Sequence, residues 1–242
     1  MTKNVGYYII KKVKKYLKDS AKGVKIFMVK LVIFDLDGTL INSNGDLKFC
    51  MNKMLSDYNL PTITTEETYK FVGYGARKFV ELALKGNLEN FEERFNTFNK
   101  YLATYSGDNA YIYDGLDELL ISLKNQGVKL AIVSNKQQDA TDFVVSKMLG
   151  KYNFDVVCGI GGNFKTKPDT TAVEYVLKTL NISKQNTLYV GDSEIDMITA
   201  INAGLKSVGV LWGFRTKEQL IEKGGKVFAK NAKELAEIIK GL

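Results

Sequence analysis

The first candidate for chemistry is a pair of aspartates at the end of an apolar run. The segment 32–39 reads VIFDLDGT, so Asp35 and Asp37 stand two positions apart. Paired carboxylates can divide the work, because one can attack a substrate while the other transfers a proton or helps to hold a cation. An isolated D-x-D-G is more typical of a turn at a strand end. The pair therefore predicts catalysis only together with other motifs.

Two later segments carry groups that suit an anion. Ser134 and Asn135 follow the apolar run 130–133. A hydroxyl and backbone N–H groups at a strand-to-helix junction can cradle an anion. Taken alone, however, the tripeptide Ser134-Asn135-Lys136 is more simply explained as a helix N-cap. Lys167 lies in a K-T-K-P-D segment just before a predicted helix. It could neutralise phosphate charge at the same edge of a sheet.

A second pair of acids suits a metal ion. Asp192 ends another apolar strand in a Gly-Asp step, and Asp196 follows about one helical turn later. Carboxylates with substrate and water oxygens are what Mg²⁺ prefers. An N-capping role for Asp192 is the alternative.

The residues that the chain lacks narrow the chemistry further. It contains no histidine, which excludes Ser-His-Asp and Cys-His mechanisms and the usual imidazole zinc sites. Cys50 and Cys158 form no C-x-x-C motif and lie in apolar stretches, so we expect two reduced, packed thiols. Any chemistry must then use carboxylates, lysines, hydroxyls and backbone amides, with a hard metal as a further option.

Alternating strands and helices are expected to position these residues. Five short segments are rich in β-branched residues and bounded by turn signals, and they predict strands over 31–34, 130–134, 154–158, 187–190 and 207–211. Helical spacing of apolar residues occurs over 115–125, 170–180 and 195–203. This alternation predicts an α/β fold with a Rossmann-like parallel sheet and helices on both faces.

One long segment breaks the alternation. Residues 45–107 contain no convincing strand, and their apolar positions recur at three and four. We predict an all-helical cap inserted after the first strand. The α/β core then comprises residues 28–44 and 108–242, and residues 1–27 form a basic extension.

The four motifs should meet in space, because loops at the carboxyl ends of parallel strands open on one edge of the sheet. Together they supply an aspartate nucleophile, an acid/base aspartate, a hydroxyl and a lysine for phosphoryl oxygens, and acids for Mg²⁺. Phosphoryl transfer through an aspartyl-phosphate requires this set.

In residues and order, the four motifs resemble those of the haloacid dehalogenase superfamily over roughly residues 29–230. The chain looks most like the phosphoglycolate phosphatase-like branch with a helical cap, which also fits the segments 71–75, 113–115 and 161–162. The resemblance implies a Mg²⁺-dependent phosphatase for a small phosphorylated metabolite. Asp35 would attack phosphorus, and Asp37 would protonate the leaving oxygen and then activate water. Ser134, Asn135 and Lys167 would hold the phosphoryl group.

The resemblance also implies a metal set. Mg²⁺ would be ligated by Asp35, by the backbone carbonyl of Asp37 and by Asp192. Asp196 would orient these metal ligands. Lys165 is a rival for the phosphate-binding lysine, but the adjacent proline favours Lys167.

Substrate choice is predicted to lie in the cap. Gly73 and Gly75 would let backbone amides approach a substrate, and Arg77 could bind a carboxylate or a second anion. A solvated arginine in a turn between helices is an equally good reading. Asn42 stands where many relatives have a second aspartate, and we expect it to tune the hinge of the cap.

The charge of the chain belongs mostly to its N-terminus. The net charge is +7, and residues 1–27 hold eight lysines against one acid, so the remaining chain is neutral. No nucleic-acid partner is therefore expected. A basic amphipathic helix could contact a membrane, but we favour neither this nor a catalytic role for the extension. No membrane span or signal peptide is evident, so we expect a cytoplasmic monomer or homodimer.

Other functions remain open from the sequence. A sugar-phosphate mutase, a pyrophosphatase or a nucleotidase would use the same motifs, and a degenerate relative could serve as a non-catalytic binding scaffold. Family mutases typically place a specific basic residue, often histidine, in the hinge, and this chain has none. A dehalogenase would lack the second aspartate of D-x-D. The intact motif residues disfavour a scaffold.

Overall fold

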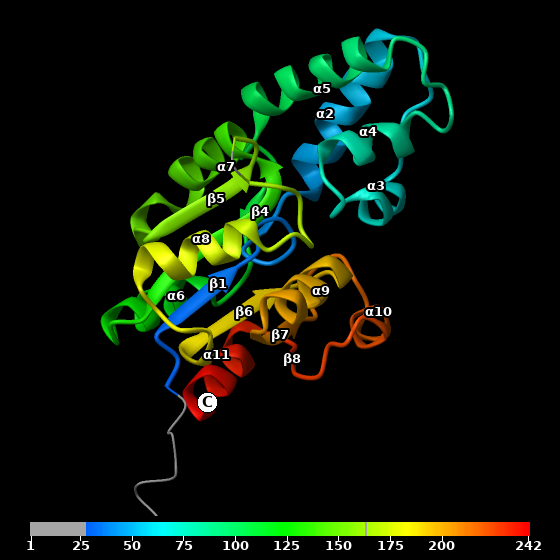
Figure 1. The fold of residues 1–242 in the computed structure, drawn as a ribbon. Coiled ribbons are helices and arrows are strands. Elements are labelled where there is room, and N and C mark those ends of the chain that lie inside the picture. The colour runs from blue at the N-terminus through cyan, green and yellow to red at the C-terminus, as the bar shows by residue number, and fades with distance from the viewer. Residues whose placement is uncertain (1–27, 163) are drawn as a thin grey trace, which may run out of the picture.

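The computed structural model describes residues 28–162 and 164–242. Its centre is a parallel sheet of six strands in the order β5-β4-β1-β6-β7-β8, with β1 between β4 and β6 (Figure 1). The strands of this sheet are β1 Leu31–Phe34, β4 Lys129–Gln137, β5 Val156–Ile160, β6 Thr187–Gly191, β7 Lys206–Val210 and β8 Phe228–Ala229. The predicted Rossmann-like α/β class is confirmed.

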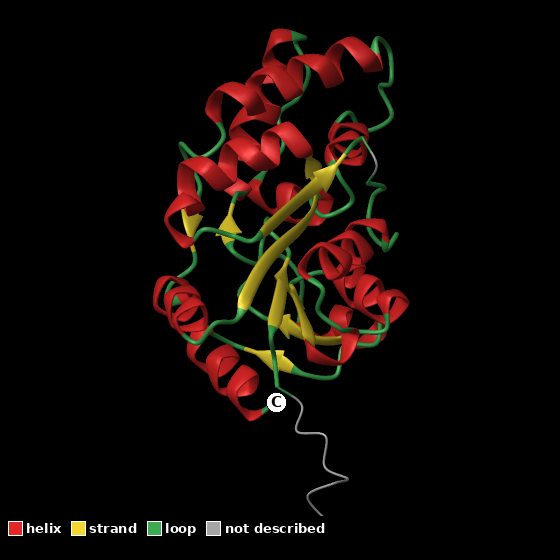
Figure 2. Ribbon diagram, turned by 60° about the vertical axis from the view of Figure 1, so that its left-hand side comes forward, coloured by secondary structure: helices red, strands yellow, loops and turns green. Residues whose placement is uncertain are grey.

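Helices cover both faces of this sheet (Figure 2). Alternate residues of β1 enter two separate cores, with Val32 and Phe34 in one and Leu31 and Ile33 in the other. The first core includes side chains of α6 (Leu116–Asn125) and α11 (Ala232–Gly241). The second includes α8 (Thr171–Leu180) and α9 (Glu194–Ala203). Burial on both faces explains the continuous apolar runs of these strands.

Four further helices form a layer beyond the carboxyl ends of the strands (Figure 1). They are α2 Asn44–Asp57, α3 Thr65–Phe71, α4 Ala76–Ala83 and α5 Phe91–Tyr105. Their buried side chains, such as Met54 and Phe98, form a third core of their own. A reciprocal capping box between Thr64 and Glu67 starts α3. This layer is the cap, and its boundaries at 45 and 107 stay a prediction.

The two chain segments that join core and cap lie side by side. They pair as a two-stranded antiparallel sheet, β2 (Ile41–Asn42) with β3 (Tyr111–Ile112). Asn42 donates from Nδ2 to the Tyr111 hydroxyl over 3.0 Å, and its Oδ1 accepts from the Asn44 N–H at the start of α2. Asn42 thus lies in the segments that connect core and cap, and its effect on a hinge stays a prediction. The strands β2 and β3 were not predicted, because each has only two residues.

Four further elements of the core were not predicted. They are the short helices α7 (Gln138–Val144) and α10 (Lys217–Glu222), the edge strand β8 and the C-terminal helix α11. The first three are too short for a clear hydrophobic period, whereas the apolar spacing of α11 was overlooked. The predicted amphipathic helix within 1–27 lies outside the described residues.

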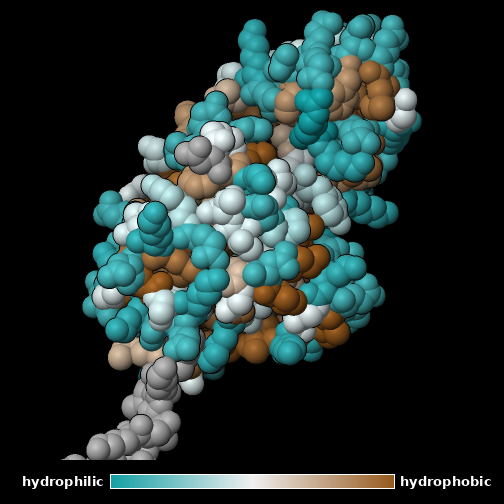
Figure 3. All heavy atoms as spheres, viewed as in Figure 1, coloured by the Kyte–Doolittle hydropathy of each residue, from teal (hydrophilic) through white to brown (hydrophobic). Residues whose placement is uncertain are grey.

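The described surface is mostly hydrophilic on the face seen in Figure 3. Among the residues that the structure describes, no helix is long and apolar enough to cross a membrane. Cys50 and Cys158 are both buried and unbridged, as expected.

Candidate active site

Three neighbouring strands bring the motif residues to one edge of the sheet. Asp35 follows β1, Ser134 lies within β4, and Asp192 follows β6. These three side chains are almost wholly buried. The register of β4 against β5 shifts between Val133 and Gln137, and such an irregularity can re-aim side chains at a functional edge.

Lys167 links two of the predicted acids. Its Nζ donates to Asp35 Oδ1 over 2.8 Å and to Asp196 Oδ1 over 2.7 Å. Burial opposes its charge, but the nearby carboxylates of Asp196 and Asp35 hold the pKa of Lys167 well above its usual range. Lys165 is exposed, so the structure brings Lys167 and not its rival to the aspartates.

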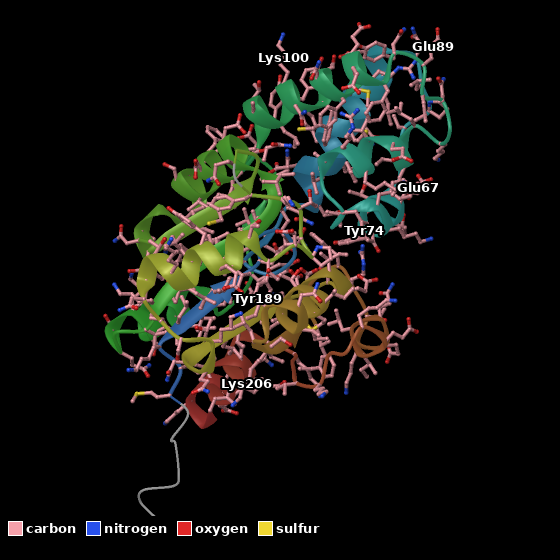
Figure 4. The ribbon with its side chains drawn as sticks, viewed as in Figure 1. Glu67, Tyr74, Glu89, Lys100, Tyr189 and Lys206 are labelled. Atoms are coloured by element: carbon pink, nitrogen blue, oxygen red, sulfur yellow. The ribbon has the colours of Figure 1, made fainter. Side chains whose placement is uncertain are left out.

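Asp196 is held by hydrogen bonds on both of its oxygens. Oδ2 accepts from the backbone N–H and the hydroxyl of Ser193, which form a capping box at the start of α9. Oδ1 accepts from Lys167 and from the Tyr189 hydroxyl, and Tyr189 comes from the middle of β6 (Figure 4). The contacts of Asp196 therefore suit a residue that fixes Lys167 and adds negative charge.

Among the described residues, Asp192, unlike Asp196, accepts hydrogen bonds only from neutral donors, so no cation hydrogen-bonded to it offsets its negative charge. Its Oδ1 accepts from the Thr39 hydroxyl over 3.0 Å and its Oδ2 from the Phe214 N–H over 2.8 Å. Burial and the charge of Asp196 raise its pKa to about 7. Burial likewise raises the pKa of Asp35 well above its ordinary value, and Asp196 adds to this effect.

The donor set fits a divalent cation. Oxygens of Asp35, Asp192 and Asp196 lie within 4.8 Å of one another. Lys167 is the only cation hydrogen-bonded to these three carboxylates in the described chain, so negative charge is left over. Oxygen ligands and a surplus of negative charge are what Mg²⁺ requires. Asp35 and Asp192 are better placed than Asp196 to hold such an ion. Within the described residues, Asp196 accepts from four donors, whereas Asp192 accepts from two neutral donors and Asp35 from Lys167 alone.

Asp37 has a cationic partner that the sequence did not indicate. Lys136 Nζ lies 3.1 Å from Asp37 Oδ1 and 3.0 Å from Asp37 Oδ2, and the Lys136 side chain is only 9% exposed. The sequence around Lys136 does not distinguish it from a solvated loop lysine. Only the folded structure, in which β4 pairs with β1, reveals the contact.

A cavity with about 60 Å³ of free space lies between the cap and the strand ends. Asp35, Asp37, Ser134 and Lys167 line it from the core, and the loop Gly73–Ala76 and Phe79 line it from the cap. Asn135 ties the two sides together, because its side chain donates to the Gly73 carbonyl over 3.3 Å and accepts from the Lys167 N–H over 2.7 Å. The structure thus brings Gly73, Gly75 and Asn135 to the predicted pocket.

Arg77 does not line this pocket, so of its two sequence readings the structure matches the solvated arginine and not the anion-binding one. Its side chain is 59% exposed, pairs with Glu92 and lies over the rings of Phe91 and Phe95. It follows the glycine loop in sequence, but α4 begins at Ala76 and turns it toward α5 on the outside of the cap.

A different arginine lies at the cap–core boundary. Arg215, from the loop after β7, donates to the backbone carbonyls of Tyr69 and Val72 at the end of α3 over 2.7 Å and 2.6 Å. Its Nε donates to Glu194 over 2.8 Å, and it is only 8% exposed. Tyr74, at the edge of the cap that faces the core (Figure 4), lies over the guanidinium. No local sequence signal separates such an arginine from an exposed one.

A parallel α/β sheet with an aspartate pair after its first strand, a strand-end Gly-Asp, a buried lysine and a helical insert defines a class of phosphoryl-transfer hydrolase. A family model described as haloacid dehalogenase-like hydrolase matches residues 32–210. The chain belongs to this family, which confirms the resemblance found in its motifs.

Relatives and solved structures support the same assignment. The chain is 30% identical over 213 residues to phosphoglycolate phosphatase 1 of Pseudomonas aeruginosa, covering 85% of this chain and 78% of that protein. It is 31% identical over 187 residues to a phosphoglycolate phosphatase of Aquifex aeolicus, covering 77% and 86% of the two chains. The crystal structure of a candidate phosphoglycolate phosphatase of Lactobacillus delbrueckii subsp. bulgaricus matches with a TM-score of 0.81 and 27% identity, over 88% of this chain and 98% of that one.

Proposed function

We propose that this chain is a Mg²⁺-dependent phosphatase that hydrolyses a small phosphomonoester, phosphoglycolate or a close analogue, through an aspartyl-phosphate on Asp35. One observation carries the proposal: buried Lys167 bridges Asp35 and Asp196 beside Asp192, in the cavity that also contains Asp37 and Ser134. The relatives named phosphoglycolate phosphatase suggest the substrate.

In the first step, an Asp35 oxygen attacks phosphorus and the bond from phosphorus to the ester oxygen breaks. Asp37 gives its proton to the leaving oxygen. In the second step, Asp37 takes a proton from water, which attacks phosphorus and releases Asp35 and inorganic phosphate. Lys167 and the Ser134 hydroxyl hold the phosphoryl oxygens, and Asn135 fixes the Lys167 backbone.

Asp35, the Asp37 carbonyl and Asp192 are the residues that would hold Mg²⁺. When bound, the ion would neutralise charge on the phosphoryl oxygens. The catalytic cavity is enclosed by the cap residues Gly73, Gly75 and Phe79, which favours a small substrate.

The test is phosphate release by the purified chain across a panel of phosphoglycolate, sugar phosphates, nucleoside monophosphates and pyrophosphate. We expect release from phosphoglycolate with Mg²⁺ and none after chelation. Asp35→Asn should lower kcat by about 10³-fold or more while the circular dichroism spectrum is kept. Substantial turnover by that variant would refute Asp35 as the nucleophile.

A further inference from the structure

The candidate active site contains a second buried ammonium group that the proposed steps do not use. Lys136 Nζ contacts both oxygens of Asp37. In the part of the chain that the structure describes, no other hydrogen-bond acceptor is recorded for this group. An ammonium has three donors, so Lys136 can hold Asp37 and still bind a further acceptor in the cavity.

Lys136 also lies where two cavities meet. It lines the catalytic cavity with Asp35 and Lys167, and it lines a neighbouring cavity of about 510 Å³ with Asn99 and Asp139. Ala76 and Leu102 of the cap line both cavities as well. A substrate whose phosphate lies at Asp35 and Lys167 therefore has its other end near Lys136.

The other cations of the region are already engaged. Lys167 binds Asp35 and Asp196, and Arg215 binds Glu194 and the cap carbonyls. Arg77 lies outside the cavity. Asp139 lines the neighbouring cavity of about 510 Å³. Its negative charge disfavours an anion that lies beyond Lys136 in that cavity.

We propose that Lys136 binds a second anionic group of the substrate, a carboxylate attached one carbon away from the ester oxygen. This inference rests on the proposed function, in which Asp37 protonates that oxygen. Because Lys136 touches Asp37, a carboxylate separated from the ester oxygen by a single carbon comes within reach of its ammonium group. Lys136 thereby selects acidic phosphomonoesters over neutral ones of equal size.

The experiment compares 2-phosphoglycolate with 2-hydroxyethyl phosphate, which has the same chain length and no carboxylate. Both are assayed with saturating Mg²⁺ on the wild type, on Lys136→Met and on Lys136→Arg. A charge-assisted hydrogen bond of this kind corresponds to about a 10- to 100-fold preference. In Lys136→Met we expect the ratio of kcat/KM values, acidic over neutral, to fall by about that factor, with the larger change in KM for phosphoglycolate.

Lys136→Arg should keep most of the preference, because it keeps the charge. Lys165→Met is the matched control, since this lysine is exposed in a nearby loop, and its ratio should equal that of the wild type. Inhibition provides a measurement without mutation: glycolate should compete with substrate in the wild type, and ethylene glycol should not.

The possible results are distinct. An unchanged ratio in Lys136→Met, with both substrates slowed equally, would overturn the inference and leave Lys136 as a partner of Asp37 only. A wild type that hydrolyses both substrates equally well would also overturn it, while the phosphatase function stands. Absence of Mg²⁺-dependent phosphate release from every phosphomonoester would instead refute the proposed function itself.

Discussion

At the scale of single residues, Asp192 decides how the site responds to pH. Burial and the charge of Asp196 raise its pKa to about 7 in the metal-free chain. A cation that binds this carboxylate must displace the proton below that pH. Mg²⁺ affinity should therefore be about tenfold weaker at pH 6 than at pH 8, and should fall by up to about tenfold for each further pH unit.

Titration calorimetry at pH 6 and pH 8, in buffers of different ionisation enthalpy, measures both the affinity and the protons released. We expect proton release at pH 6 and little at pH 8. Equal affinities with no proton release at either pH would contradict the assignment of Asp192 as a ligand.

Gly38 gives a second prediction at this scale. It has φ +92°, and a Cβ atom there would lie 2.4 Å from Asp192 Oδ2. Gly38→Ala should displace the Asp192 carboxylate and weaken Mg²⁺ binding by about tenfold or more. Gly86→Ala is the matched control, because Gly86 has φ +91° with nothing within 4 Å of its Cβ position. Calorimetric Mg²⁺ affinities that fall equally in both variants would show that backbone strain alone is responsible.

At the scale of elements, residues 213–215 connect the acidic cluster of the candidate site with the cap. The Phe214 N–H holds Asp192, and the Phe214 ring packs on Tyr69 with centroids 5.4 Å apart. Arg215 next to it holds the end of α3. One short segment thus contacts both Asp192 and the cap, and we expect the position of the cap to influence the Asp192 side chain.

Arg215→Ala should loosen the cap, because it leaves Glu194 and two cap carbonyls without their buried partner. We expect faster hydrogen exchange over residues 69–75 and a kcat/KM lower by about tenfold. Arg77→Ala is the control, since an exposed ion pair contributes little, and both readouts should stay at wild-type values. Equal effects of the two substitutions would refute the role given to Arg215.

At the scale of the whole molecule, the cluster of buried carboxylates should make stability depend on pH and on a bound metal ion. The raised pKa of Asp192 means that the folded, metal-free chain binds this proton more tightly than the unfolded chain does. This contribution to stability is lost as pH rises from about 4 toward 7. Mg²⁺ should compensate for the loss near neutral pH.

Mg²⁺ at 100 times its dissociation constant should stabilise the fold by about 2.7 kcal/mol. For a chain of this length, that corresponds to a rise in Tm of about 5–10 °C. Differential scanning calorimetry at pH 7.5 measures the shift in Tm. The control replaces Mg²⁺ with Na⁺ at equal ionic strength, in buffer free of Ca²⁺. In Asp192→Asn the shift should vanish; its survival would place the ion elsewhere.

Much of the fold follows from local patterns. Residues 31–34 form β1 as predicted, because a β-branched run before D-x-D-G favours only a buried strand. The helices over 171–180 and 194–203 likewise follow from their apolar spacing. The two-residue strands β2 and β3 could not be predicted, because their pairing depends on contacts between positions about 70 residues apart.

The candidate site divides in the same way. The sequence by itself indicated that Asp35, Asp37, Ser134, Lys167 and Asp192 belong to one site. Four of them lie at or just after predicted strands, Lys167 lies just before a predicted helix, and the carboxyl ends of parallel strands meet at one edge of a sheet. Only the tertiary structure decided the partners: Lys136 against Asp37, Arg215 under the cap, and Arg77 outside the cavity. The physical reason is that a lysine or arginine has the same local signature whether it is buried or solvated, and only packing between distant segments determines which charge it meets.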